Sequence, residues 1–175
     1  MQQAHQKNVE NGIRLPYPFL PPEELRAKIE NRGVMFVALT EGRLVALGAV
    51  IILNKNLWCG KGLYGYSCLD AVLPGYEGRG LYRAISMKQE EYVLSKGVTR
   101  IFFDTHERNT RMIELSKKSG YELIEYKIRE RHNSVLMVKW LRNRPYSHLY
   151  CLFKYMGIMY KRKFFALMKK LYNIL

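Results

Sequence analysis

The sequence has 175 residues, 48% of them hydrophobic, which suits a single soluble domain with a packed core. The formal net charge is +14, and ten of the 29 Lys and Arg residues but none of the 15 acidic residues lie after Glu130. The polar N-terminus and the lack of any run of about 18 uncharged apolar residues argue against a signal peptide and a membrane-spanning helix.

The first half of the chain predicts a helix followed by three strands. Residues 1–20 are polar and then rich in proline, which favours irregular structure. Pro22 and the two acids after it are typical of a helix start, and this helix is expected to stop at Gly33. Strands are expected at 34–39, 44–53 and 63–73, with a turn at Glu41-Gly42 and a loop at 57–62.

The apolar period changes after Pro74, and the second half predicts two helices and three strands. Apolar residues recur at helical spacing from Leu81 to Lys96, and Gly97 provides a C-terminal stop. A strand, a helix and two strands are expected at 99–105, 109–119, 121–130 and 134–141. This order predicts a mixed α/β (α+β) domain over residues 1–144, followed by a separate basic tail at 145–175.

A glycine-rich turn, Leu73-Pro-Gly-Tyr-Glu-Gly-Arg-Gly-Leu-Tyr-Arg83, joins the third strand to the helix at 81–96. Glycines let successive backbone N–H groups point into one concavity, and the helix N-terminus adds partial positive charge. The turn could therefore hold a pyrophosphate, with Arg79 and Arg83 at its rim. The glycines could equally serve only the geometry of the turn, because short glycine patterns are weak signals.

Two segments together resemble the GCN5-related N-acetyltransferase (GNAT) superfamily. Val72–Tyr82 is similar to that family's coenzyme A loop, Q/R-x-x-G-x-G/A, and the segment from Thr105 through Asn109 to Tyr121 is similar to its second half. The resemblance covers residues 34–140. It implies a mostly antiparallel sheet with splayed central strands, flanked by helices, and acetyl-CoA or another acyl-CoA as the co-substrate.

The resemblance also implies which residues bind coenzyme A. The backbone of Ala71 and Val72 would pair with pantetheine amides, and Asn109 would lie near the pantetheine arm, where it also suits a helix N-cap. The pyrophosphate would be held by backbone N–H groups of Gly78, Arg79, Gly80, Leu81 and Tyr82.

The loop departs from the family pattern at two positions. Glu77 stands where Gln or Arg is usual, and an acid is unfavourable there unless it points outward or pairs with Arg79 or Arg83. Tyr82 stands where Gly or Ala is usual, and it could narrow the channel for the acyl chain.

The sequence gives only a weak indication of the general acid. Many members of the family use a tyrosine in the pattern Y-x-x-x-G-F/Y, but the matching residue here is Ser116, a poor proton donor. Tyr121 and Tyr126 are close in sequence but are better explained as strand residues.

Asp70 is the first candidate for the base that deprotonates the acceptor, because it is the only carboxylate of the third strand. Strict alternation would place it on the same face as Tyr64, Tyr66 and Cys68. A structural, hydrogen-bonded role for Asp70 fits equally well. Asp104 is the second candidate base and His106 the third.

The tail at 146–175 has apolar residues at three- and four-residue steps, with Lys and Arg mostly elsewhere on the helical wheel. This pattern predicts a basic amphipathic helix that could lie on an anionic membrane surface. It could equally pack on its own domain or on a second copy in a homodimer. Nucleic acid is the least favoured partner, because no motif that reads bases accompanies the basic residues.

Three functions are compatible with these features. The first is an N-acetyltransferase that acts by direct attack of an amine of a small molecule or of a membrane-associated precursor. The second is a long-chain acyltransferase using acyl-CoA or acyl carrier protein. The third is a catalytically quiet module that binds acyl-CoA or recruits the protein to a membrane. Three cysteines without C-x-x-C spacing argue against a metal site and fit the cytoplasm, with the tail at the inner membrane face.

Overall fold

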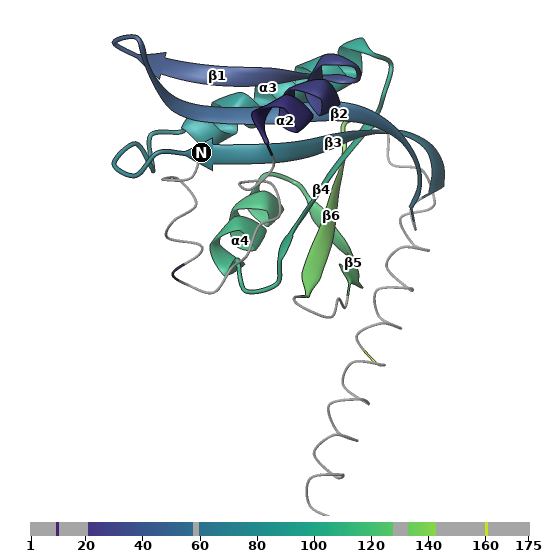
Figure 1. Cartoon of the computed structure of the whole chain (residues 1–175). Coiled ribbons are helices and arrows are strands. Elements are labelled where there is room, and N and C mark those ends of the chain that lie inside the picture. The colour runs from purple at the N-terminus through teal and green to yellow at the C-terminus, as the bar shows by residue number, and fades with distance from the viewer. Residues whose placement is uncertain (1–9, 11–20, 58–59, 128–132, 143–159, 161–175) are drawn as a thin grey trace, which may run out of the picture.

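The framework is a six-stranded sheet in the computed structural model, which describes residues 10, 21–57, 60–127, 133–142 and 160 (Figure 1). The strands are ordered β1-β2-β3-β4-β6-β5 across the sheet. The elements are α2 (Pro22–Glu30), β1 (Gly33–Thr40), β2 (Arg43–Leu57), β3 (Gly60–Val72), α3 (Leu81–Ser95), β4 (Arg100–His106), α4 (Thr110–Lys118), β5 (Glu122–Lys127) and β6 (Ser134–Trp140).

All neighbouring strands are antiparallel except β3 and β4. These two central strands are parallel, and in the described residues they pair only at Gly65↔Ile101 and Tyr66↔Phe102. Beyond these pairs they part: β1–β3 run across the upper half of Figure 1, and β4 turns down with β6 and β5. The expected mixed, mostly antiparallel sheet with splayed central strands is therefore confirmed.

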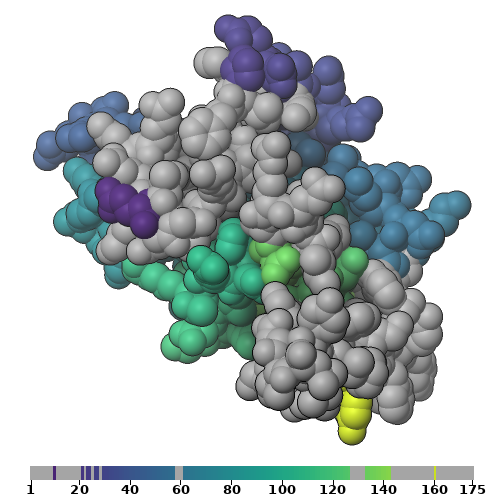
Figure 2. All heavy atoms as spheres, turned by 60° about the horizontal axis from the view of Figure 1, so that its bottom comes forward, coloured from purple at the N-terminus to yellow at the C-terminus, as the bar shows by residue number. Residues whose placement is uncertain are grey.

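The two faces of the sheet carry separate apolar clusters. Alternate residues of β4 point to opposite faces, so Ile101 and Phe103 enter one cluster and Phe102 enters the other. The first cluster also contains Val93 of α3, and Met112 of α4 packs against it. Helices α3 and α4 thus share one apolar cluster although they flank different halves of the sheet. Figure 1 shows α4 in the half formed by β4–β6, and Figure 2 shows the green residues of this half grouped together.

Helix α3 contacts β1, β2 and β3, and two strand glycines make room for it. A Cβ atom at Gly65 would collide with the Val93 side chain, and one at Gly48 would lie 2.6 Å from Ile85 Cγ2. Real Cβ atoms essentially never come this close to another atom. The glycines therefore allow α3 to approach the β2–β3 hairpin more closely than side chains would permit.

One strand prediction is wrong. Residues 57–62 were expected to form a loop, but β2 continues to Leu57 and β3 begins at Gly60, with these two residues paired. The apolar run ends near Leu53, but an antiparallel ladder is held by backbone hydrogen bonds and can continue through exposed polar residues. The long hairpin therefore could not be read from hydrophobicity alone.

The predicted irregular segment at 1–20 and the predicted tail at 145–175 lie outside the described residues, apart from Glu10 and Tyr160. Within the described part of the chain, no helix is both long and apolar enough to cross a membrane.

Replacement of Gly65 by alanine should destabilise the fold by roughly 1–3 kcal/mol, the usual cost of forcing an extra carbon into a packed core. Urea unfolding measures this difference, with Asn54→Ala, an exposed change in the same hairpin, as the control. A cost for Gly65→Ala within about 0.5 kcal/mol of the control would contradict the close packing of α3.

Candidate functional site

The loop between β3 and α3 is built on left-handed glycines. Gly75, Gly78 and Gly80 have φ values of 83°, 76° and 77°, and a Cβ at each would meet nothing within 4 Å. Space does not require glycine here, so the reason is the backbone conformation, which other residues rarely adopt. The loop therefore needs its glycines for its backbone conformation, and its binding of a pyrophosphate stays a prediction.

The cradle ends at the N-terminus of α3, where Gly80 is the N-cap and the first turn contains no acid. The other described helices differ. Helix α2 has two acids in its first turn, and the Asn109 side chain accepts a hydrogen bond from the Met112 N–H at the start of α4. The first turn of α3 thus combines partial positive charge with a lack of side-chain acceptors, which suits an anion.

Glu77, the unfavourable acid of the loop, is paired outside the loop. Its Oε2 lies 3.2 Å from Nη1 of Arg111 on α4, a partner that differs from the two considered from the sequence, Arg79 and Arg83. The Arg79 guanidinium instead lies 4.8 Å from the centre of the Tyr76 ring. Arg111 partly neutralises Glu77 and adds a cation near the cradle. Sequence reasoning missed this residue because it is 34 positions away.

Ala71 and Val72 end β3 beside the gap between the central strands. They pair with Leu47 and Ala46 of β2, so the opposite edge of this segment faces the side on which β4 has turned away. A strand edge next to such a gap can accept an extended, amide-containing ligand. Asn109 is confirmed as an N-cap and also donates to Thr105 Oγ1 at 3.2 Å. Its contact with the pantetheine arm stays a prediction.

A β-bulge interrupts β3 just before this segment. Leu69 has a positive φ of 64°, and the register runs from Ala49↔Cys68 to Leu47↔Ala71, so that Leu69 and Asp70 both lie opposite Gly48. The extra residue reverses the alternation of side chains. Asp70 consequently lies on the face of Ser67, and the prediction that it shares a face with Tyr64, Tyr66 and Cys68 is wrong.

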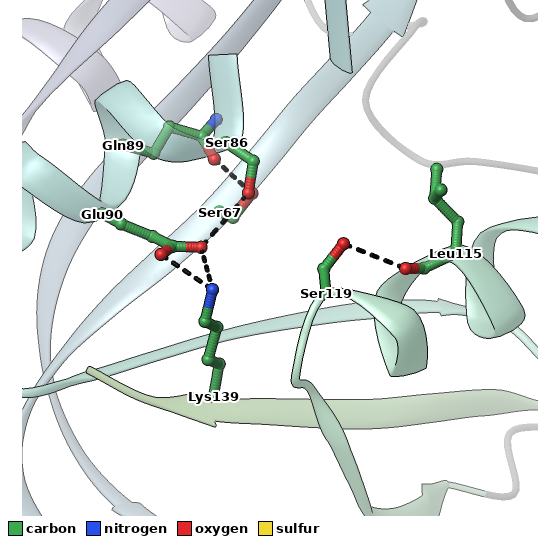
Figure 3. A network of polar contacts seen from close by, with 7 residues as sticks. All are labelled: Ser67, Ser86, Gln89, Glu90, Leu115, Ser119 and Lys139. Carbon is green, nitrogen blue, oxygen red and sulfur yellow. Dashed lines mark hydrogen bonds and ion pairs between the residues drawn. The ribbon is translucent and has the colours of Figure 1, made fainter. Parts of the chain in front are cut away.

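The Asp70 carboxyl group lies against α3 and takes part in a polar cluster. Ser67 Oγ lies 2.7 Å from Asp70 Oδ2, and Gln89 Nε2 donates to Asp70 Oδ1 at 2.7 Å. Figure 3 shows Gln89 and Ser67 in contact, with the Glu90–Lys139 ion pair nearby. Burial raises the pKa of Asp70 to about 6, against the hydrogen bonds with Ser67 and Gln89, which lower it.

Ser116, at the position of the family tyrosine, is fully buried, and its Oγ has no hydrogen-bond partner among the described residues. Tyr82 of α3 extends toward it. Burial and then the charge of Asp70 raise the pKa of Tyr82, and the nearby Ser116 hydroxyl opposes this rise without reaching normal hydrogen-bond geometry. The Tyr82 side chain therefore reaches toward α4. Tyr121 is buried and lies immediately before β5, with its ring 5.2 Å from that of Phe103, so it is a core residue but not part of the strand.

Asp104 lies on the other face of the sheet, with Phe102. The Tyr66 hydroxyl donates to Asp104 Oδ1 at 2.8 Å, and the Tyr66 ring stacks on Phe102 at 4.8 Å. Asp104 is half-buried. His106, the third candidate base, is buried, and its Nδ1 accepts a hydrogen bond from the Arg108 N–H at 3.1 Å. The structure thus separates the carboxylates of Asp70 and Asp104, and it joins Asp104 to a tyrosine.

Comparison with known proteins agrees with this geometry. The family model described as "Acetyltransferase (GNAT) family" matches residues 7–121. No curated protein sequence matches the chain. The solved ribosomal-protein-S18-alanine N-acetyltransferase from Escherichia coli is 16% identical, with a TM-score of 0.60 over 79% of this chain and 87% of that one.

Two solved aminoglycoside-modifying enzymes have similar folds. Aminoglycoside 6'-acetyltransferase type Ii is 16% identical, with a TM-score of 0.62 over 82% of this chain and 88% of that one. An aminoglycoside 6'-N-acetyltransferase complexed with coenzyme A is 13% identical, with a TM-score of 0.59 over 82% and 89%. At these identities the likeness concerns the fold.

Replacement of Glu77 by glutamine should strengthen the binding of coenzyme A by about two- to fivefold at low ionic strength, because it removes a negative charge and releases Arg111. Calorimetric titration at low and high salt measures the effect, which should shrink at high salt. Glu91→Gln, which breaks an exposed pair with Lys88 on α3, is the matched control. Weaker binding by Glu77→Gln than by the control would contradict the assignment of the cradle.

Asp70→Asn should be more stable than the wild type at pH 8, and this difference in the free energy of unfolding should be smaller at pH 4. The folded-state pKa of Asp70 is raised from 3.8 to about 6, so the wild type loses stability as pH rises through this interval, and asparagine does not ionise. A shift of about two pKa units corresponds to a gain of at most roughly 3 kcal/mol. Urea unfolding of both proteins at both pH values tests this. A difference in the free energy of unfolding between Asp70→Asn and the wild type that is the same at pH 4 and pH 8 would contradict the burial of an ionising carboxyl group.

Proposed function

Because this chain belongs to the GNAT family of acetyltransferases, we propose that it transfers an acetyl group from acetyl-CoA to an amine by direct attack. One observation carries the proposal. The glycine cradle at the start of α3 follows directly on β3, the strand that parts from its parallel neighbour β4 beyond Tyr66↔Phe102. The two features suit the two chemical parts of coenzyme A, an anionic pyrophosphate and an extended chain of amides.

The donor would bind along β3 and end at α3. Backbone N–H groups from Gly78 to Tyr82 would hold the pyrophosphate, aided by the exposed cations Arg79, Arg83 and Arg111. Backbone groups of Ala71 and Val72 would pair with the pantetheine amides. The thioester would then lie deeper in the gap, nearer the point where β3 and β4 are paired.

The reaction requires two proton movements. The amine must lose a proton before or during its attack on the thioester carbon, and the coenzyme A thiolate must gain one as the C–S bond breaks. A base within reach of the amine and a donor near the sulfur satisfy both needs. Ser116 supplies no strong acid at the position where the family tyrosine would stand.

Asp104 is better placed than Asp70 to act as the base. Both oxygens of Asp70 contact side chains, those of Ser67 and Gln89, on the α3 face of the sheet. Asp104 lies on the opposite face, two residues beyond Phe102, the last residue of β4 that pairs with β3 in the described part of the chain. The Tyr66 hydroxyl, held at 2.8 Å from Asp104, could pass a proton to the departing thiolate and be restored from Asp104. Under this assignment Tyr66 is the general acid that could not be identified from the sequence.

The acceptor would be an amine of a small molecule or of a membrane-associated precursor. Solved structures of similar fold are named for transfer to an alanine of a ribosomal protein and to aminoglycosides. The basic segment at 146–175 would hold the enzyme on an anionic membrane surface in the second case. Such an enzyme would work in the cytoplasm at the inner membrane face.

The function is tested by thiol release from acetyl-CoA with a panel of aminoglycosides, polyamines and peptides with free N-termini. Turnover of acetyl-CoA should exceed that of long-chain acyl-CoA and of acyl carrier protein substrates. Faster turnover of the long-chain donors would favour a long-chain acyltransferase. Binding of acetyl-CoA without turnover of any amine would contradict the enzyme and favour a binding module.

Replacement of Asp104 by asparagine should lower kcat/KM at pH 7 by about 10²–10⁴-fold while coenzyme A binding stays unchanged, because a general base contributes about this much. Thiol-release kinetics and calorimetry measure the two effects. Glu114→Gln, an exposed change on α4, is the control. Activity of Asp104→Asn equal to that of the control would exclude Asp104 as the base.

A further inference from the structure

The polar cluster of Asp70, Ser67 and Gln89 beneath α3 contains more hydrogen bonds than a general base requires. Gln89 of α3 is completely buried and donates through Nε2 to two acceptors, Asp70 Oδ1 at 2.7 Å and the Ala49 carbonyl at 3.2 Å. Two acceptors on this side fix the orientation of the amide group, because its oxygen would be repelled there. Gln89 Oε1 therefore faces Ser67 Oγ, at 2.9 Å.

The hydroxyl of Ser67 then has more acceptors than protons. It lies 2.7 Å from Asp70 Oδ2 and 2.9 Å from Gln89 Oε1, but it carries a single hydrogen. When Asp70 is ionised, Ser67 can donate to only one of these acceptors at a time. When Asp70 is protonated at Oδ2, the conflict is resolved: Asp70 donates to Ser67, Ser67 donates to Gln89, and Gln89 donates back to Asp70. The three side chains then form a closed ring of hydrogen bonds in which every group is used.

The surrounding residues leave this ring little freedom. Gly48 lies opposite the bulge, and a Cβ there would come within 2.8 Å of Gln89 Nε2 and would collide with Asp70 Oδ1. The bulge at Leu69 and Asp70 brings the carboxyl group under α3 in the first place. The hairpin and helix thus share a closely packed polar cluster that leaves no room for a side chain at Gly48.

The ring joins the two parts of the proposed donor site. Asp70 immediately precedes Ala71 and Val72, whose backbone would pair with pantetheine, and Gln89 belongs to the helix whose first turn completes the cradle. A rigid link between them would keep the strand edge and the cradle at the separation that coenzyme A requires.

We propose that Asp70, Ser67 and Gln89 are positioning residues that hold the pantetheine edge of β3 in fixed relation to the phosphate cradle of α3. Asp70 acts through its hydrogen bonds and takes no proton from the acceptor. The inference rests on the proposed acetyl-CoA function and adds to it the residues that determine donor affinity. Buried polar rings of this kind specify one arrangement more strongly than apolar contacts do.

The first test is Asp70→Asn. Asparagine can donate from Nδ2 to Ser67 and accept at Oδ1 from Gln89, so the ring survives without an ionisable group. The Kd of coenzyme A, measured by calorimetry, and kcat/KM should stay within about threefold of wild type at pH 5.5, where Asp70 is mainly protonated and each hydrogen bond keeps its partner. A loss of about 100-fold in kcat with unchanged Kd would overturn the proposal, because it is the result expected of a general base.

The second test is Gln89→Ala, with Met87→Ala, an exposed change on the same helix, as the matched control. Gln89→Ala should raise the Kd of coenzyme A and the KM of acetyl-CoA by about tenfold, while kcat at saturating donor stays within about threefold, because ground-state and transition-state binding weaken together. An unchanged Kd would overturn the proposal. Ser67→Ala removes one hydroxyl and gives the same readout if Gln89→Ala does not fold.

The wild-type titration separates the two proposals. Failure of the wild type to bind coenzyme A would contradict the proposed function itself. Binding by the wild type together with equal binding by Gln89→Ala and Met87→Ala would contradict only the positioning role. Wild-type affinity in Asp70→Asn together with weaker binding by Asp70→Ala would identify the hydrogen bonds of Asp70, and not its charge, as the feature that determines the affinity for coenzyme A.

Discussion

The close packing of α3 on the β2–β3 hairpin is the constraint on which the rest of the structure depends. Gly65 and Gly48 remove side chains from the contact, so that Val93, Ile85 and Gln89 can reach the strands. With α3 held at this distance, its first turn follows β3 through a short loop of left-handed glycines. The divergence of β4 from β3 then leaves the end of β3, next to that loop, outside the described pairing between the two strands. The proposed donor site depends on these contacts, because they set the position of the loop relative to the end of β3.

The two central carboxylates show how one sheet can separate structural from chemical tasks. Asp70 faces the helix, where burial raises its pKa to about 6 and where Ser67 and Gln89 use both of its oxygens. Asp104 faces the opposite side and contacts the Tyr66 hydroxyl. A buried carboxyl group that ionises costs stability, whereas one that hydrogen-bonds as a neutral acid can order its surroundings. The face of the sheet on which each carboxylate lies therefore distinguishes the proposed roles of Asp70 and Asp104 more clearly than their positions in the sequence do.

Local features of the site could be predicted from the sequence, and long-range ones could not. The glycine loop and the N-cap at Asn109 depend on a few adjacent residues, and both are present as expected. The bulge at Leu69 escaped prediction because a leucine with positive φ has no signature in the sequence, and this one residue moved Asp70 to the other face. The Glu77–Arg111 pair and the Tyr66–Asp104 contact join residues more than thirty positions apart, which periodicity cannot detect.

Amide hydrogen exchange with and without coenzyme A tests the central claim most directly, because it reads the backbone groups that the account assigns to the donor. Coenzyme A should slow exchange at residues 78–82 and at Ala71 and Val72, while β5 and β6 stay unchanged. Desulfo-coenzyme A should protect the same amides, because neither the cradle nor the pantetheine edge requires the sulfur. Protection that is absent from both segments, or that is confined to other parts of the chain, would contradict the account.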